Sequence, residues 1–335
     1  MNACAPTLAL TAPATLAEAP SPPCLIVNPR SFNASRGLAA QAMALAAAHG
    51  AEVVSVDSAG ATRAAINAVL ARRQRQLMVL AGDGTVSAIV DQLSSLPAGA
   101  WTPDVLVLPG GRSNLTARDL LAGSAALPTL KRALLAPPAG PGHSGVSERC
   151  ALRIEQAGSP TRHGFFLAAA LIDSAIRQCH RQRAEGMLQG DVGTFTYLLG
   201  LGVRGLWGAS GLSCPSLHID AGACGRQQGP VRLLLASTLL HRKGLLDPYA
   251  ARGAGEVRLT SVSADAPRFW RSLPRLVSGR YSSAMNADNG YLSGRFERVQ
   301  VNGLVHYMLD GEPCDADPSQ PVTISTGPRL RFLVP

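Results

Sequence analysis

Short apolar runs alternate with helical stretches through the first 140 residues of the chain. Four short apolar runs are predicted to be strands, at 24–27, 53–56, 77–81 and 105–108, and the run at 77–81 is unbroken and rich in Leu and Val, as expected of a strand buried on both faces. Between and after them, helical sequence is predicted near 35–49, 62–73, 86–93 and 115–121. Strands that alternate with helices predict an α/β domain with a doubly wound parallel sheet over residues 24–140.

The pattern changes after a Pro- and Gly-rich stretch at 137–142. Beyond it, short segments indicate further strands, near 150–155, 165–171, 232–235, 257–262, 299–301 and 306–309. Helices are predicted near 174–188, 193–206 and 267–278. Residues 148–335 are therefore expected to form a β-rich, mostly antiparallel β-sandwich domain with a few helices, whose last strand can pack back on the first domain. Residues 1–23, rich in Ala, Pro and Thr, are expected to be a disordered leader.

Polar, turn-forming residues follow three of the predicted parallel strands. Asn28 and Pro29 end the first strand, Gly82-Asp83-Gly84-Thr85 follows the third, and 110–114 follows the fourth. Because the carboxyl ends of parallel strands meet at one edge of a sheet, these turns are expected to lie together where ligands bind. Glycines at a helix N-terminus let backbone N–H groups approach an anion closely. The turn at 82–85 is therefore suited to a phosphate.

Composition narrows the class of partner. The 31 Lys and Arg residues exceed the 22 Asp and Glu residues, and the net charge of +9 favours anionic partners such as nucleotides or acidic lipid surfaces. Aromatic residues make up only 4%, and no basic stretch is interleaved with them, so nucleic acid is not an expected partner. The seven Cys form no CxxC pair, and no apolar run approaches the ~18 residues that span a bilayer. We expect a cytoplasmic protein without a transmembrane segment.

Four motifs in order resemble the catalytic domain of diacylglycerol kinases, and more specifically the related bacterial lipid kinases and the sphingosine kinases. They are Asn28-Pro29, Gly82-Asp83-Gly84-Thr85, the segment 109–118 with its Gly and Asn, and Asp310-Gly311-Glu312. The final segment, 328–335, is similar to the terminal strand of the family. The glycine turn alone is weak evidence for this resemblance, since NAD kinases and phosphofructokinases carry related turns. The order of the four motifs carries the resemblance, which spans residues 24–335.

This resemblance implies ATP-dependent phosphorylation of a lipid hydroxyl, of diacylglycerol or sphingoid type, with Mg²⁺. It implies an active site in the cleft between the two domains. The protein would meet its lipid substrate peripherally, at the inner face of a membrane, and the sequence leaves a homodimer open. In addition, cationic residues of the predicted helix 174–188 are candidates for contact with lipid headgroups, with a solvated face as the alternative: Arg177, His180, Arg181 and Arg183.

The resemblance also implies roles for individual residues. Those that would bind the nucleotide lie at the end of the first strand and in the two glycine-rich turns: Asn28, Gly82, Asp83, Gly84, Thr85, Gly111, Arg112 and Asn114. Asp83 would also lie near the metal ion. Asp310 and Glu312 would be the catalytic acidic residues, with Asp310 as the general base, because an alcohol nucleophile benefits from a carboxylate that accepts its proton.

The chain departs from the family pattern at four positions: Ala81, Ala88, Arg112 and Leu115. Ala81 replaces a usual glycine, where a Cβ costs about 1 kcal/mol if φ is positive and nothing if the residue ends the strand. Ala88 and Leu115 replace frequent acidic residues. Two alternatives therefore stay open: an NAD-kinase-like kinase of a soluble acceptor, and a nucleotide- or lipid-binding member of the family without turnover.

Overall fold

The computed structural model covers the chain and describes residues 21–31, 34, 37–111, 114–121, 125–136, 145–170, 214–222, 225–240 and 247–334. Several predictions from the sequence fall outside these residues. They are the leader up to residue 20, the helices near 174–188 and 193–206 with their cationic residues, and Arg112. Within the described part of the chain, no helix is both long enough and apolar enough to cross a membrane.

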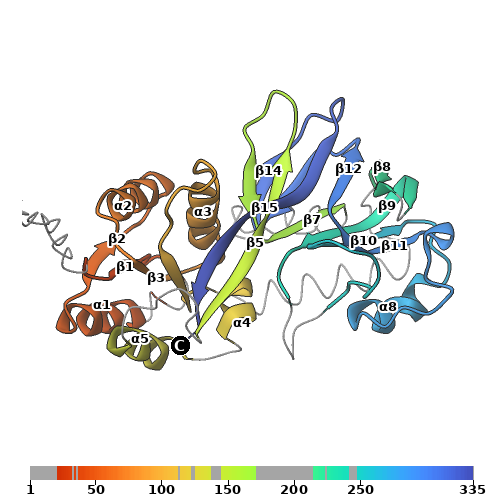
Figure 1. The fold of residues 1–335 in the computed structure, drawn as a ribbon. Helices are drawn as coiled ribbons and strands as arrows, with labels where there is room; N and C mark the ends of the chain where they lie inside the picture. Colours follow the sequence, from red (N-terminus) through yellow and green to blue (C-terminus); the bar gives the residue numbers. More distant parts are fainter. Residues whose placement is uncertain are drawn as a thin grey trace, which may run out of the picture.

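The first half of the chain forms a parallel sheet with helices on both faces (Figure 1). In spatial order its strands are β4 (Asp104–Pro109), β3 (Gln76–Ala81), β1 (Cys24–Val27) and β2 (Glu52–Ser55). On one face lie α2 (Ala59–Ala71) and α3 (Asp83–Ser94), and on the other lie α1 (Leu38–Ala48) and α5 (Ala126–Leu135). The doubly wound arrangement predicted from the sequence is confirmed. A short helix, α4 (Leu115–Leu121), follows β4.

The second half is mostly antiparallel, as predicted. Its strands are β5 (Val146–Glu155), β6 (Arg162–Gly164), β7 (Phe166–Ala170), β8 (Ser216–Asp220), β9 (Arg226–Ser237), β10 (Val257–Ser263), β11 (Tyr291–Phe296), β12 (Arg298–Asn302), β13 (His306–Leu309), β14 (Glu312–Asp315) and β15 (Val322–Leu333). The long strand β9 pairs first with β8 and then with β7 and β10, so it joins two sheets. Leu234 from one sheet and Ile324 from the other belong to the same buried core. Helix α8 (Phe269–Val277) and the 3₁₀ turn η3 (Ala287–Asn289) complete this half.

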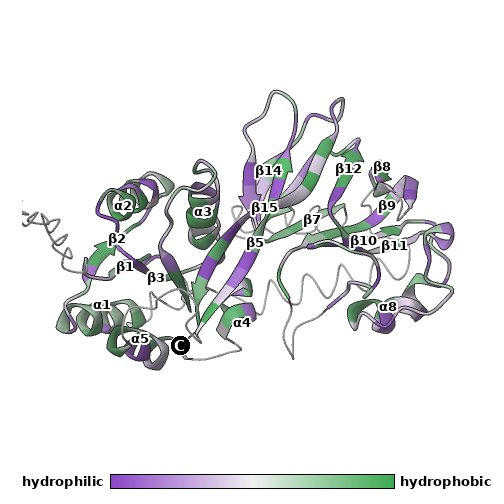
Figure 2. Ribbon diagram, in the orientation of Figure 1, coloured by the Kyte–Doolittle hydropathy of each residue, from purple (hydrophilic) through white to green (hydrophobic). Residues whose placement is uncertain are grey.

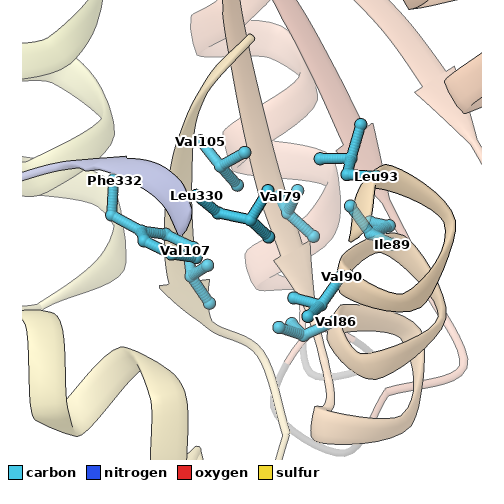
Figure 3. A pocket seen from close by; sticks show the side chains of 9 residues that line it. All are labelled: Val79, Val86, Ile89, Val90, Leu93, Val105, Val107, Leu330 and Phe332. Carbon is cyan, nitrogen blue, oxygen red and sulfur yellow. The ribbon is translucent and has the colours of Figure 1, made fainter. Parts of the chain in front are cut away.

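Strand β15 connects the two halves. Phe332 pairs in parallel with Val105 of β4, while most of β15 runs antiparallel to β5. Leu330 and Phe332 lie against the valines of β3 and β4 and against the apolar stripe of α3 (Figure 3). The space among these side chains leaves about 0 Å³ for water, so the last strand belongs to the core beneath α3. This packing sets the position of the glycine turn at the N-terminus of α3 relative to the second half.

For two helices, the hydrophobic pattern did not predict the start of the helix or the helix itself. Helix α3 begins at Asp83, three residues before its apolar stripe, because Gly82 occupies the N-cap and the first turn is polar. Helix α5 was not predicted, since Pro128 interrupts its pattern; in the first turn of a helix a proline is tolerated because that N–H has no partner. The pattern predicts the interior of a helix better than its polar first turn.

Candidate active site

A cavity of about 570 Å³ lies between the two halves of the molecule. One wall is formed by the end of β1 and the N-terminal parts of α2 and α3, and the other by β6, the end of β13 and the start of β14. The lining residues that matter for the chemistry are Asn28, Ser58, Gly84, Thr85, Arg162 and Glu312. The volume lies in the range of small-molecule and cofactor sites.

The glycine turn after β3 forms part of the first wall. Ala81 is the last residue of β3 and does not have a positive φ, so its Cβ carries no conformational cost. The Gly82 N–H donates to Ser31 Oγ at 2.9 Å, and Asn28 Nδ2 donates to Thr85 Oγ1 at 2.9 Å. These bonds attach the first turn of α3 to the end of β1. Its early N–H groups lack partners within the helix, which makes this turn a ready site for an anion.

The second glycine turn, after β4, packs behind the first. A Cβ on Gly111 would lie 2.6 Å from the Cα of Gly82, so only glycine permits this close approach of the two backbones. Asn114, with φ of 51°, closes the turn: Oδ1 accepts the Gly111 N–H at 2.7 Å, and Nδ2 donates to the Gly111 carbonyl at 2.9 Å. Gly111 and Asn114 therefore support the cavity wall without lining it.

Asp83 is turned toward the second glycine turn and away from the cavity. Its two carboxylate oxygens accept the N–H groups of Asn114 at 2.9 Å and Leu115 at 3.0 Å, at the start of α4. Burial raises the pKa of Asp83, and these backbone donors oppose the rise. Both oxygens thus have protein partners, and the proximity of Asp83 to a metal ion stays a prediction.

The donor set of the site fits Mg²⁺ only as an ion shared with a ligand. Among the described residues, no three His, Cys, Asp or Glu side chains are grouped so as to hold a metal ion. Mg²⁺ commonly uses only one or two carboxylates, together with water and substrate phosphates. The carboxylates that line the cavity, Asp57, Asp91 and Glu312, can meet that need, whereas Asp83 is turned away from it.

Asp310 lies behind the cavity, in the turn between β13 and β14. Its side chain is 8% exposed, and its carboxylate accepts the N–H groups of Phe165 at 3.0 Å and Phe166 at 2.8 Å. A side-chain hydrogen bond also joins Asp310 to Ser87 of α3. Burial raises the pKa of Asp310 to about 7; the hydrogen bonds lower it, and the charge of Asp83 adds to the rise. Asp310 therefore connects the second half of the molecule directly to α3.

Glu312 lies at the cavity wall, against the glycine turn. A Cβ added to Gly84 would collide with the Glu312 carboxylate, so the two residues are in close contact across the cavity. The structure thus brings together Asn28, Gly82, Gly84, Thr85 and Glu312 at the cavity surface. The two acidic residues that the sequence paired lie in different surroundings, one buried and one exposed to the cavity.

Some cavity residues were not found from the sequence. Asp57 and Ser58 follow β2, and the rule that ligands bind at strand carboxyl ends could have identified them. Arg162 and His163 belong to a three-residue strand that shows no pattern. The backbone N–H of His163 donates to Asp91 Oδ1 at 2.7 Å, which attaches β6 to α3.

The replacement at position 88 also affects this wall. Ala88 of α3 lines the cavity, at the position where the sequence resemblance implies a glutamate. Ala88 adds no carboxylate to this wall. Leu115, by contrast, takes part through its backbone N–H, which donates to Asp83, so the change of side chain leaves that contact in place.

The fold and the cavity define a two-part α/β protein with a glycine-lined site between its halves, and comparison with known proteins gives the class. Residues 22–136 match the diacylglycerol kinase catalytic domain. This region contains three of the four motifs on which the sequence resemblance to the family rests.

Solved structures agree on the fold over nearly the whole chain. Two structures assigned provisionally as a diacylglycerol kinase from Bacillus anthracis str. Sterne superimpose with TM-scores of 0.65 and 0.64, at 12% and 13% sequence identity. A third, described as a diacylglycerol kinase from the same organism, gives a TM-score of 0.58 at 12% identity. Each match covers 94% of this chain and 97% of the other. Comparison with curated protein sequences yields no significant match.

Proposed function

We propose that the protein is an ATP-dependent lipid kinase that transfers the γ-phosphoryl group of ATP to a hydroxyl of a diacylglycerol or sphingoid lipid. It would act at the cytoplasmic face of a membrane. The observation that carries the proposal is the contact of Glu312 with Gly84 across the cavity, which joins an anion-binding turn to a carboxylate. The match of residues 22–136 to the diacylglycerol kinase catalytic domain supports both ATP and a lipid acceptor.

Phosphoryl transfer needs positioning and charge neutralisation more than covalent help from the protein. In the proposed complex the first turn of α3 receives the phosphates through the N–H groups around Gly84 and Thr85. Asn28 orients the Thr85 hydroxyl by its hydrogen bond of 2.9 Å. When bound, Mg²⁺ would neutralise charge on the triphosphate, with the carboxylates that line the cavity as candidate protein ligands.

We assign the general base to Glu312 rather than to Asp310. Glu312 lines the cavity, where an acceptor hydroxyl can reach it. Asp310 is 8% exposed, does not line the cavity, and accepts hydrogen bonds from two backbone N–H groups. Asp310 then acts as a positioning residue, which holds the β13–β14 turn and Glu312 against α3.

The test is transfer of label from [γ-³²P]ATP to a mixed lipid extract. We expect labelled lipid with the wild-type protein and about 10²- to 10⁴-fold less with Glu312→Gln, the usual contribution of a general base. Transfer that survives Glu312→Gln would refute the assignment of the base. Label that appears in NAD and in no lipid would identify the soluble-acceptor alternative.

One observation favours a second candidate, a nucleotide-binding member without turnover. Asp83 and Asn114 have their hydrogen bonds satisfied within the protein, and Ala88 adds no carboxylate to the wall. This candidate predicts saturable binding of ATP by calorimetry with no ATP consumed across a lipid panel. The kinase proposal predicts ATP consumption that depends on the added lipid.

A further inference from the structure

Helix α8 and the residues on either side of it carry a group of exposed arginines that do not line the cavity. Four positions are exposed: Arg268, Arg271, Arg275 and Arg280. No acidic residue occurs between Asp265 and Asp288, so this stretch holds a local charge of +4. Within the described part of the chain, none of the four forms an ion pair. We call these four side chains the α8 basic surface.

The apolar side of α8 is already occupied by the protein. Leu276 is buried with Val262 and Tyr291, and Phe269 and Leu273 pack against that cluster. The guanidinium of Arg232 lies 4.7 Å from the centre of the Phe269 ring and 6.0 Å from that of Trp270. The helix is therefore fixed to the body of the molecule, and Figure 2 shows hydrophilic positions along it. Its outer side offers charge, with the partly exposed Trp270 beside it.

We propose that the α8 basic surface docks the protein on an anionic lipid bilayer. The inference rests on the proposed function, since a kinase of bilayer lipids must work where its acceptor lies. The argument is charge complementarity: each arginine close to an anionic leaflet raises binding by about fivefold. Tryptophan favours the membrane–water interface, which suits Trp270 beside the arginines.

The bilayer fits this surface better than a nucleic acid does. A single-strand site needs several aromatic side chains on which bases stack, and of the two partly exposed ones in α8, Phe269 already packs against the core and Arg232. The surface lies at α8, beside β11, whereas α2 and α3 form the cavity wall in the other half of the molecule (Figure 1). Substitutions on it therefore leave the cavity intact, and docking can be tested separately from catalysis.

The experiment compares two variants that each lose three positive charges. The docking variant is Arg271→Gln, Arg275→Gln and Arg280→Gln; Arg268 is kept, because its φ of 54° disfavours most replacements. The control variant is Arg63→Gln, Lys131→Gln and Arg132→Gln, at exposed positions of α2 and α5. Binding is measured by cosedimentation with vesicles of phosphatidylcholine, with and without phosphatidylglycerol, at low and high salt.

We expect the wild-type protein to bind only the vesicles that contain phosphatidylglycerol, and to be released by salt. The docking variant should bind about 100-fold more weakly, from three factors of about five, and the control variant within a few-fold of the wild type. Equal losses in both variants, no preference for anionic vesicles, or tighter binding to duplex DNA than to vesicles would overturn the proposal.

A second readout separates this proposal from the proposed function. With diacylglycerol dispersed in neutral detergent, no anionic surface is present, so the docking variant should phosphorylate it as fast as the wild type. If the wild-type protein transfers phosphate to neither diacylglycerol nor a sphingoid base in detergent, the kinase proposal fails, while the vesicle measurement, which uses no ATP, still decides docking. A docking variant that loses activity in detergent but binds vesicles normally contradicts the role assigned to this surface.

Discussion

The two walls of the cavity offer different chemistry to a ligand. The wall from the first half presents backbone N–H groups, hydroxyls and one amide around Gly84, Thr85 and Asn28, together with the carboxylates of Asp57 and Asp91. The wall from the second half presents ionisable side chains, Arg162 and Glu312, with Asp310 buried behind them. The first wall is suited to binding phosphates, and the second to taking up a proton. The difference teaches that neither half is a complete site without the other.

Within each wall, the residues that face the cavity differ from the residues that lie behind them. Asp83 and Asn114 sit behind the glycine turn and join α3 to α4, while Asp310 sits behind Glu312 and joins β7 to the β13–β14 turn. The motif residues thus fall into two groups: those that can contact a ligand, and those that hold the first group in position. The two groups should respond differently to substitution.

The largest effect is expected from the residue that would carry the proton transfer. Glu312→Gln keeps the size of the side chain and removes its basicity. We expect kcat to fall by about 10²- to 10⁴-fold while the affinity for ATP stays within a few-fold. A large loss of ATP affinity with little change in kcat would show that Glu312 binds ATP and does not act as the general base.

A methyl group at Gly84 would disturb the contact between the walls. The added Cβ collides with the flexible end of Glu312, so the carboxylate must move while the helix is kept. We expect activity to fall by about 100-fold, as for a misplaced catalytic group. Stability should stay level or rise by up to about 1 kcal/mol, because alanine favours a helix over glycine.

Gly60→Ala is the matched control for that substitution. Gly60 lies in α2 with open space around its Cα, so the same methyl group meets nothing there. The Gly60→Ala variant should gain a similar amount of stability, and its activity should equal that of the wild type. If both variants lose activity alike, the contact of Gly84 with Glu312 has no special role.

Asp310→Asn should change stability and its pH dependence. The pKa of Asp310 is about 7 in the folded state against 3.8 as its ordinary value, so between these values the folded protein holds a proton that the unfolded chain has lost. The stabilisation from this proton is complete below pH 3.8 and is lost toward pH 7, at about 1.4 kcal/mol per pH unit. The asparagine variant lacks this titration.

Chemical denaturation of both proteins at several pH values measures the effect. The difference in unfolding free energy, wild type minus variant, should shrink as the pH rises toward 7 and stay level above it. Above pH 7 a residual loss of about 1–3 kcal/mol is expected in the variant, since an amide cannot replace every acceptor contact. A difference that does not vary with pH would contradict the raised pKa.

The smallest effect is expected at the edge of the first wall. Asn28→Ala removes the hydrogen bond to Thr85 and should cost about 1 kcal/mol of stability and raise the KM for ATP a few-fold. Arg30→Ala is the control, because its exposed pair with Asp57, at 3.6 Å, contributes less than about 0.5 kcal/mol. Equal changes in KM for the two variants would remove Asn28 from the nucleotide site.

The first half was more predictable than the second because its signals are local. Each buried strand is a continuous apolar run, and β1, β3 and β4 lie within one or two residues of their predicted bounds. In the second half, β8 and β11 were missed, and α8 was found only from a helical stretch near 267–278. Each of these two strands interrupts its few apolar residues with polar residues or glycine, so no clear local pattern reveals it.

By itself, the sequence determined where the glycine turns lie and that they resemble the motifs of the diacylglycerol kinase catalytic domain, because a glycine turn between a strand and a helix is a contiguous feature. Only the tertiary structure decided that Glu312 meets Gly84 while Asp310 is buried and Asp83 faces α4. The reason is that burial and side-chain direction depend on the pairing of β15 with β4 and β5, which brings together segments from opposite ends of the chain.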